Sequence, residues 1–143
     1  MTKRGVGNPW AIAPVAPGAA ILDIGCGAGF DLVVASRLTG GSGRVLGTDL
    51  TREMIERARQ SIRLAGAANV EAELVEDERV PAADATFDVV VANGVFNLSP
   101  DKPRLFAEIV RVLKPGGRLQ FADIILEKPL SLEMAGSAGS WSQ

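Results

Sequence analysis

Short apolar runs alternate with amphipathic segments along this chain of 143 residues. The apolar runs have the length of strands, and Val89-Val90-Val91 is typical of a strand that is buried on both faces. We predict strands over residues 19–24, 44–49, 70–75, 87–93 and 118–126. Helical patterns cover residues 28–39, 52–65 and 100–114 between them, and residues 81–86 form a polar loop.

Each helical segment carries apolar residues at steps of three and four, which is the spacing of one helix face. In the first helical segment the stripe consists of Phe30, Val33, Val34 and Leu38, and we expect it to face the sheet. In the second segment the stripe is Ile55, Ala58, Ile62 and Ala65, and in the third it is Leu105, Ile109, Val112 and Leu113. Thr51 and Ser99 are predicted N-caps, with Pro100 at the first helical position. Gly66 and the Pro115-Gly116-Gly117 run are predicted helix stops.

This alternation of strands and helices predicts one α/β domain over residues 1–143, with a doubly wound, Rossmann-like parallel sheet. We expect strand order 3-2-1-4-5 and a ligand beyond the carboxyl ends of the first and fourth strands. Residues 1–18 are predicted to be an irregular lead-in and residues 127–143 a flexible tail, so the core is truncated after the fifth strand.

Composition narrows the function classes. A net charge of −2 and a pI of about 5.2 without a basic stripe argue against nucleic acid. No apolar run reaches the roughly 18 residues of a membrane span, and residues 1–15 lack a signal-peptide core, which predicts a cytoplasmic location. The chain has no His, no Tyr and one Cys, which excludes Ser-His-Asp and Cys-His catalysis, disulfides and structural zinc. We expect no metal site.

The most informative segment is Ile21–Gly29, an apolar run followed by Asp23 and three glycines spaced two apart. Glycines at the end of a buried strand, followed by a helix, are typical of a nucleotide-cofactor cradle. The spacing differs from the dinucleotide pattern G-x-G-x-x-G, because the third glycine falls one place early and Phe30 stands where that pattern needs glycine. A glycine-rich turn that binds no ligand is the alternative.

Two candidate residues mark the end of the second strand, because Asp49 is its last residue and Leu50 follows directly. The Asp49 carboxylate could accept both ribose hydroxyl hydrogens, or it could simply cap the next helix. Leu50 could lie against an adenine face, or it could pack in the core.

Further candidates lie at other strand ends. An acid of the Glu76-Asp77-Glu78 run could accept from an adenine amino group, although such runs are often solvated loops. Asn93 could hold the amino-acid part of a cofactor, or serve as a turn residue. Asp23 needs a partner at the end of a buried strand, which turn amides or a ligand ammonium could supply. We interpret Cys26 as a small residue that fits the turn rather than as a reactive thiol.

The chain resembles class I S-adenosylmethionine-dependent methyltransferases of the UbiE type, and within them the arsenite methyltransferase-like branch. The segments that carry the resemblance are residues 22–31, 47–54, 97–102 and 111–118, and it covers residues 5–126. It implies S-adenosylmethionine as cofactor and a cofactor site lined by Asp23, Gly25, Gly27, Asp49, Glu76 and Asn93.

The chain departs from that branch where arsenite enzymes carry a catalytic cysteine behind the asparagine, because Gly94 occupies this place. We therefore expect methyl transfer to a small molecule other than arsenite, with no catalytic base assigned; Asp101 is within reach but suits a helix N-terminus. The alternatives are a non-catalytic module that binds S-adenosylmethionine or S-adenosylhomocysteine, such as a remnant acting in an assembly, and a nicotinamide-dependent oxidoreductase. The fifth strand would be an apolar edge, which predicts a homodimer, cover by residues 127–143, or aggregation.

Overall fold

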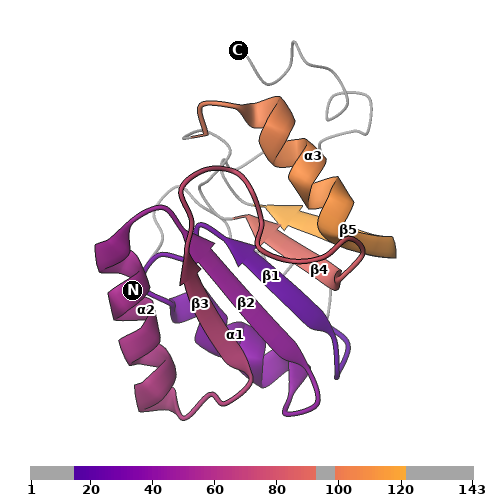
Figure 1. Ribbon diagram of the computed structural model, residues 1–143. Helices are drawn as coiled ribbons and strands as arrows, with labels where there is room; N and C mark the ends of the chain where they lie inside the picture. Colours follow the sequence, from indigo (N-terminus) through magenta and orange to yellow (C-terminus); the bar gives the residue numbers. More distant parts are fainter. Residues whose placement is uncertain (1–14, 93–98, 122–143) are drawn as a thin grey trace, which may run out of the picture.

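A computed structural model describes residues 15–92 and 99–121 of the chain. The elements run β1 (Ala20–Ile24), α1 (Phe30–Thr39), β2 (Arg44–Asp49), α2 (Arg52–Ala65), β3 (Val70–Leu74), β4 (Phe87–Ala92), α3 (Lys102–Val112) and β5 (Leu113–Phe121) (Figure 1). All strands pair in parallel in the order β3-β2-β1-β4-β5. The predicted Rossmann-like fold and strand order are therefore confirmed.

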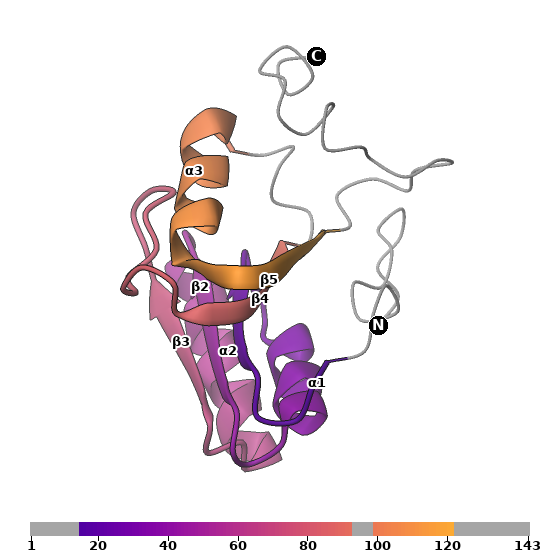
Figure 2. The same cartoon turned by 90° about the vertical axis from the view of Figure 1, so that its right-hand side faces the viewer.

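The two faces of the sheet bury separate apolar clusters, because alternate strand residues point to opposite faces. On one face, strand residues such as Ile21, Val45 and Val91 pack with residues of α1 and α2. On the other face, Leu22 and Val90 pack with Leu105, Ile109 and Val112 of α3, which confirms the apolar stripe of the third helix. Helices α1 and α3 accordingly lie on opposite sides of the sheet (Figure 2).

Helix α1 presents a different face to the sheet from the predicted one. Phe30 is 58% exposed and Leu38 is 40% exposed, and Val33 and Val34 are only half-buried. The buried residues of α1 are Asp31, Leu32, Ala35 and Thr39. A Cβ at Gly47 of β2 would lie 2.7 Å from both Leu32 methyl carbons, so Leu32 occupies the space that this glycine leaves open. The close approach of helix and strand thus selects Leu32 rather than the larger Phe30.

Helix α2 begins and ends as predicted, between Thr51 and a left-handed Gly66 with φ of 65°. Thr51 makes no side-chain capping bond, however, and of the expected stripe only Ile55 and Ala58 are buried. Strands β1 and β3 are one residue shorter than expected, and Asn93 lies outside the described residues.

The boundaries around α3 also differ from the prediction. Asp101, not Ser99, is the N-cap, because its Oδ1 accepts a hydrogen bond from the Arg104 N–H at 3.1 Å. The chain then enters β5 at Leu113 without a break, so the Pro-Gly-Gly run does not stop the helix. Phe87 pairs with Leu113 but Val89 pairs with Arg118, which places this run in an irregularity of β5. Residues 122–126 and 127–143 lie outside the described residues. Within the described part, every helix is too short or too polar to cross a membrane.

Candidate cofactor site

The glycine turn after β1 has a backbone that only glycine adopts easily. Gly25, Gly27 and Gly29 have φ angles of 74°, 56° and 92°, which explains why glycine recurs at every second position. The N–H groups of Gly25 and Cys26 both donate to the Thr48 carbonyl, at 2.8 and 2.9 Å. The turn is therefore fixed to the end of β2 as well as to β1.

Two of these glycines face different surroundings. A Cβ at Gly29 would lie 2.9 Å from the Ala58 Cα, so this glycine lets the start of α1 approach the backbone of α2. A Cβ at Gly27 would have no atom within 4 Å, so space beside this residue is open. The turn thus combines close packing on one side with room on the other.

Asp49 joins the turn to the start of α2. Its Oδ2 accepts from the Gly27 N–H at 3.0 Å, and its Oδ1 accepts from the Thr51 N–H at 2.9 Å. The bond to Thr51 reaches the N–H of the N-cap residue itself and none of the N–H groups inside α2, so Asp49 holds the chain just before the helix without capping it. Since a carboxylate offers about four lone-pair positions, two acceptor positions remain for a ligand. Asp49 is half-buried, so these positions are accessible.

A pocket of about 200 Å³ opens beside Asp49, where β1, β2 and β3 end. Its lining consists of residues at and after the strand ends, the segment after β3, one residue before α3 and one within α3: Ile24, Gly25, Thr48, Asp49, Leu50, Thr51, Val75, Asp77, Glu78, Arg79, Val80, Ser99 and Leu105. Whole ligand pockets typically measure about 300–1,000 Å³, so these residues accommodate part of a cofactor-sized molecule.

Four of the predicted residues line this pocket: Gly25, Asp49, Leu50 and Asp77. Leu50 is 58% exposed, so the alternative of core packing is wrong for it. Glu76 is exposed and lies outside the pocket lining, whereas its neighbours Asp77 and Glu78 belong to it. The structure thus brings the second and third acids of this run to the pocket.

Three other predicted residues, Asp23, Cys26 and Gly27, are not part of the pocket lining, and Asn93 lies outside the described residues. Asp23 is fully buried in β1 between Gly47 and Val91. Cys26 is buried, and burial together with the charges of Asp23 and Asp49 raises the pKa of its thiol far above the ordinary value. The thiol is therefore protonated, in agreement with its interpretation as a small turn residue. Gly27 contacts the site through Asp49.

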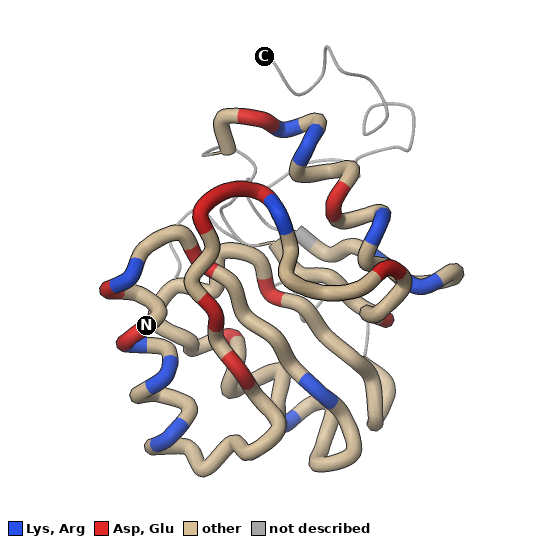
Figure 3. The backbone as a smooth tube through the Cα atoms, viewed as in Figure 1, with Lys and Arg blue, Asp and Glu red and all other residues tan. Residues whose placement is uncertain are grey.

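Polar groups within the segment after β3 and at Ser99 form hydrogen bonds there. Asp77 Oδ1 accepts from the Arg79 N–H at 2.8 Å, and Ser99 Oγ donates to Glu78 Oε2 at 3.1 Å. Figure 3 shows the acidic positions at the beginning of this loop, above the end of β3. Three acidic residues and one arginine therefore belong to the pocket lining, whose surface is otherwise mostly apolar.

Sequence reasoning missed the apolar lining residues Ile24, Val75, Val80 and Leu105. Ile24 and Val75 stand at or next to the ends of predicted strands, so the strand-end rule could have identified them. Val80 and Leu105 reach the pocket only through the folding of the chain, and no local pattern marks them.

A family model for a methyltransferase domain matches residues 16–141 of the chain. An arsenite methyltransferase of Halobacterium salinarum is 46% identical over 125 residues, which are 87% of this chain and 32% of that protein. The ubiquinone/menaquinone biosynthesis C-methyltransferase UbiE of Klebsiella pneumoniae is 39% identical over 119 residues, covering 80% of this chain and 47% of that protein.

Among solved structures, an arsenic(III) S-adenosylmethionine methyltransferase from Chlamydomonas reinhardtii superposes with a TM-score of 0.73 at 33% identity, covering 92% of this chain and 47% of that chain. The chain spans about a third to a half of the length of these proteins. The family match covers the strands, the glycine turn and the pocket described above. This chain therefore belongs to the methyltransferase domain family of S-adenosylmethionine-dependent enzymes.

Proposed function

We propose that this chain binds S-adenosylmethionine in the pocket at the ends of β1, β2 and β3 and serves methyl transfer to a small-molecule acceptor. When bound, this cofactor supplies an electrophilic methyl group on a sulfonium, a reaction in which the protein contributes mainly alignment and proximity. Such a reaction needs no imidazole, which suits a chain without histidine.

The position of Asp49 is the observation that carries this proposal. The carboxylate stands between the glycine turn and α2, and each of its oxygens keeps one acceptor position beside its backbone bond. Those two positions suit the paired hydroxyl groups of a ribose. Ile24, Leu50, Val75 and Val80 then provide apolar contacts for an adenine ring.

The acids after β3 complete the fit for adenosine. Asp77 lines the pocket, and its carboxylate can accept from an exocyclic amino group in addition to its bond from the Arg79 N–H and its ion pair with Arg104. Glu78 lies beside it in the lining, and Glu76 is the alternative outside the lining. The acidic residues of the lining also suit a ligand that carries a sulfonium and an ammonium group. For the amino-acid end of the cofactor we propose the glycine turn over Gly25, Cys26 and Gly27, with Asp23 and Asn93 as further candidate residues.

A nicotinamide dinucleotide fits the same turn poorly. Its pyrophosphate would need free backbone N–H groups at the glycine turn. The Gly27 N–H already donates to Asp49 Oδ2, so it is not available to a pyrophosphate, and Phe30 stands where the dinucleotide pattern needs its third glycine. The geometry thus supports an adenosyl sulfonium ligand over a dinucleotide.

The acceptor that we propose is a small molecule other than arsenite. Trivalent arsenic binds thiolates, and the single cysteine of this chain is buried with a raised thiol pKa. The arsenite methyltransferases among the relatives are much longer than this chain, so the proposal concerns the residues present here.

Ligand-dependent thermal unfolding tests the cofactor. S-adenosylhomocysteine at about 100 times its Kd should stabilise the folded chain by about 2.7 kcal/mol, and NAD at the same concentration should not. Asp49→Asn should weaken S-adenosylhomocysteine binding, because an amide offers one acceptor oxygen instead of two. Stabilisation by NAD alone would refute the proposal. Turnover of labelled S-adenosylmethionine with a panel of small acceptors then separates an enzyme from a non-catalytic binding module.

The predicted homodimer through β5 is a proposal of the same kind. β5 ends the strand order in the described part of the sheet, and an edge strand can pair with a second copy. Light scattering should give the mass of a dimer for the full chain. A clean monomer after deletion of residues 127–143 would contradict pairing through this edge. The cytoplasmic location and the lack of a nucleic-acid partner stay predictions.

A further inference from the structure

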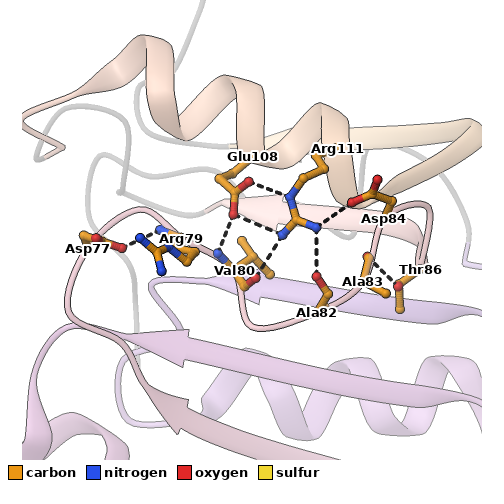
Figure 4. Close-up of polar contacts among 9 residues, drawn as sticks. All are labelled: Asp77, Arg79, Val80, Ala82, Ala83, Asp84, Thr86, Glu108 and Arg111. Atoms are coloured by element: carbon orange, nitrogen blue, oxygen red, sulfur yellow. Dashed lines mark hydrogen bonds and ion pairs between the residues drawn. The ribbon is translucent and has the colours of Figure 1, made fainter.

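Three charged residues of α3 lie at helical spacing and face the loop between β3 and β4. Arg104, Glu108 and Arg111 are separated by four and three positions, so they share one side of the helix, and we call them the α3 polar stripe. Figure 4 shows Glu108 and Arg111 pointing at the loop residues from Val80 to Asp84. The loop has no helix or strand of its own.

All N–H donors of the Arg111 side chain form hydrogen bonds, either to this loop or to Glu108. Its Nε donates to Glu108 Oε2 (2.6 Å) and its Nη2 to Glu108 Oε1 (3.1 Å) and the Val80 carbonyl (3.0 Å). Its Nη1 donates to the Ala82 carbonyl (2.9 Å) and to Asp84 Oδ1 (2.8 Å). A guanidinium group has five N–H donors, so none remains for a ligand. Arg111 is therefore suited to hold protein groups rather than a substrate anion.

Glu108 also binds this loop, at Val80. Its Oε1 accepts from the Val80 N–H at 2.8 Å, so Val80 is bound at both its N–H and its carbonyl. The Glu108 side chain is only 16% exposed. The hydrogen bond from Arg111, followed by that from Val80, lowers the pKa of Glu108 below its ordinary value, and the carboxylate is ionised at neutral pH.

The third member of the stripe contributes less. Arg104 lies 3.4 Å from Asp77, and the two side chains are 44% and 39% exposed. Exposed ion pairs of this kind contribute about 0–1 kcal/mol. The half-buried contacts of Glu108 and Arg111 are the ones that can determine the loop position.

The segment that these two residues hold forms the wall of the cofactor pocket. Val80 is 4% exposed and lines the pocket together with Leu105 of α3. The far end of the loop is attached independently, because the Ala85 and Thr86 N–H groups donate to the Arg111 and Val112 carbonyls. Loss of the side-chain contacts would therefore free the pocket wall while the connection into β4 stays in place.

We propose that Glu108 and Arg111 are positioning residues for the adenosine end of the cofactor, which they serve by fixing Val80 and the acidic segment before it. This inference rests on the proposed function. Ordering a backbone residue costs roughly 1–2 kcal/mol, so a loop without its own secondary structure needs such contacts to stay in one conformation. If the binding-competent conformation is only fractionally populated, the apparent Kd rises by the inverse of that fraction.

The test compares Arg111→Met, Arg111→Lys and Glu108→Gln with the control Lys114→Met. Lys114 pairs with Asp88 at 3.4 Å and neither residue lines the pocket, so Lys114→Met removes the same charge while the bonds of Glu108 and Arg111 to Val80 stay in place. We expect Arg111→Met to raise the Kd of S-adenosylhomocysteine about tenfold or more. Lysine should not rescue it, because one ammonium group cannot reach Glu108, two carbonyls and Asp84 together. Glu108→Gln should give a smaller rise, and Lys114→Met should stay within about twofold of the wild type.

Hydrogen exchange supplies a readout that separates loop position from global stability. In the ligand-free Arg111→Met and Glu108→Gln variants, the Val80 amide should lose protection while amides of β1 and β2 keep theirs. An unchanged Kd with an unprotected Val80 amide would overturn the proposal, and so would a Val80 amide that stays protected in both variants. Failure of the proposed function would be seen instead in the wild type, as no binding of S-adenosylhomocysteine at all.

Discussion

Replacement of Gly29 with alanine tests whether the glycine turn is required by the packing of α1 on α2. Gly29 has φ of 92° and ψ of 9°, a left-handed conformation that costs a residue with a Cβ about 1–2 kcal/mol. The added Cβ would also lie 2.9 Å from the Ala58 Cα, a backbone atom that moves only with its helix. Overpacking of this kind costs about 1–3 kcal/mol. The two effects together predict a loss of about 2–5 kcal/mol from the free energy of unfolding.

Gly66→Ala is the matched control. Gly66 has φ of 65° and ψ of 29°, but a Cβ there would have no atom within 4 Å, so only the conformational cost of about 1–2 kcal/mol applies. Urea unfolding followed by circular dichroism gives both losses from the midpoint and slope. If Gly29→Ala lowers the free energy of unfolding no more than Gly66→Ala does, close packing of Gly29 against Ala58 is not what requires glycine there.

Three further predictions concern the cap of α3, the buried thiol and acid stability. Asp101→Ala should lower the free energy of unfolding, measured in urea, by about 0.5–2 kcal/mol, because the Arg104 N–H loses its hydrogen-bond acceptor. Ser99→Ala should lower it by less, and the reverse order would mean that Ser99 is the N-cap of α3. Cys26 should resist iodoacetamide in the native chain at pH 8 and react in urea, since burial raises the thiol pKa; equal labelling in both states would contradict this. The pKa of Glu108 is lowered in the folded state, so its contribution to stability is complete above its ordinary pKa of 4.5 and is lost as the pH falls through the folded value. Glu108→Gln should flatten the decline of unfolding free energy below pH 4.5, and an unchanged decline would exclude this role.

The sheet could be predicted because its signals are local. Runs such as Ile21-Leu22 and Val89-Val90-Val91 are buried on both faces, and this is what a continuous apolar run indicates. The three glycines predicted the turn because each needs a positive φ. The handedness of crossover connections then left few strand orders.

Helix α1 and strand β5 were harder to predict because their positions depend on distant residues. The sheet-facing side of α1 is set by the gap at Gly47, which Leu32 fills and Phe30 does not. Pro115-Gly116-Gly117 suggested a helix stop, but pairing with β4 draws Leu113 into the strand first. Local propensity gives way to tertiary pairing at both places.

In the candidate site, too, some residues could be predicted from local signals and others depend on contacts between distant parts of the chain. Asp49 and Leu50 could be predicted because parallel strands bring their carboxyl ends to one edge. Glu108 and Arg111 could not, since charges at helical spacing are typical of a solvated helix face. Val80 is 28 residues from Glu108 and 31 residues from Arg111 in the sequence, so only the fold brings it to them.

The most direct test of the central claim is a crystal structure of the chain with S-adenosylhomocysteine. We expect the adenine between Leu50 and Val80, and the ribose hydroxyl groups within hydrogen-bond distance of both Asp49 oxygens. A well-ordered ligand elsewhere on the protein, or a pocket without ligand at saturating concentration, would contradict it.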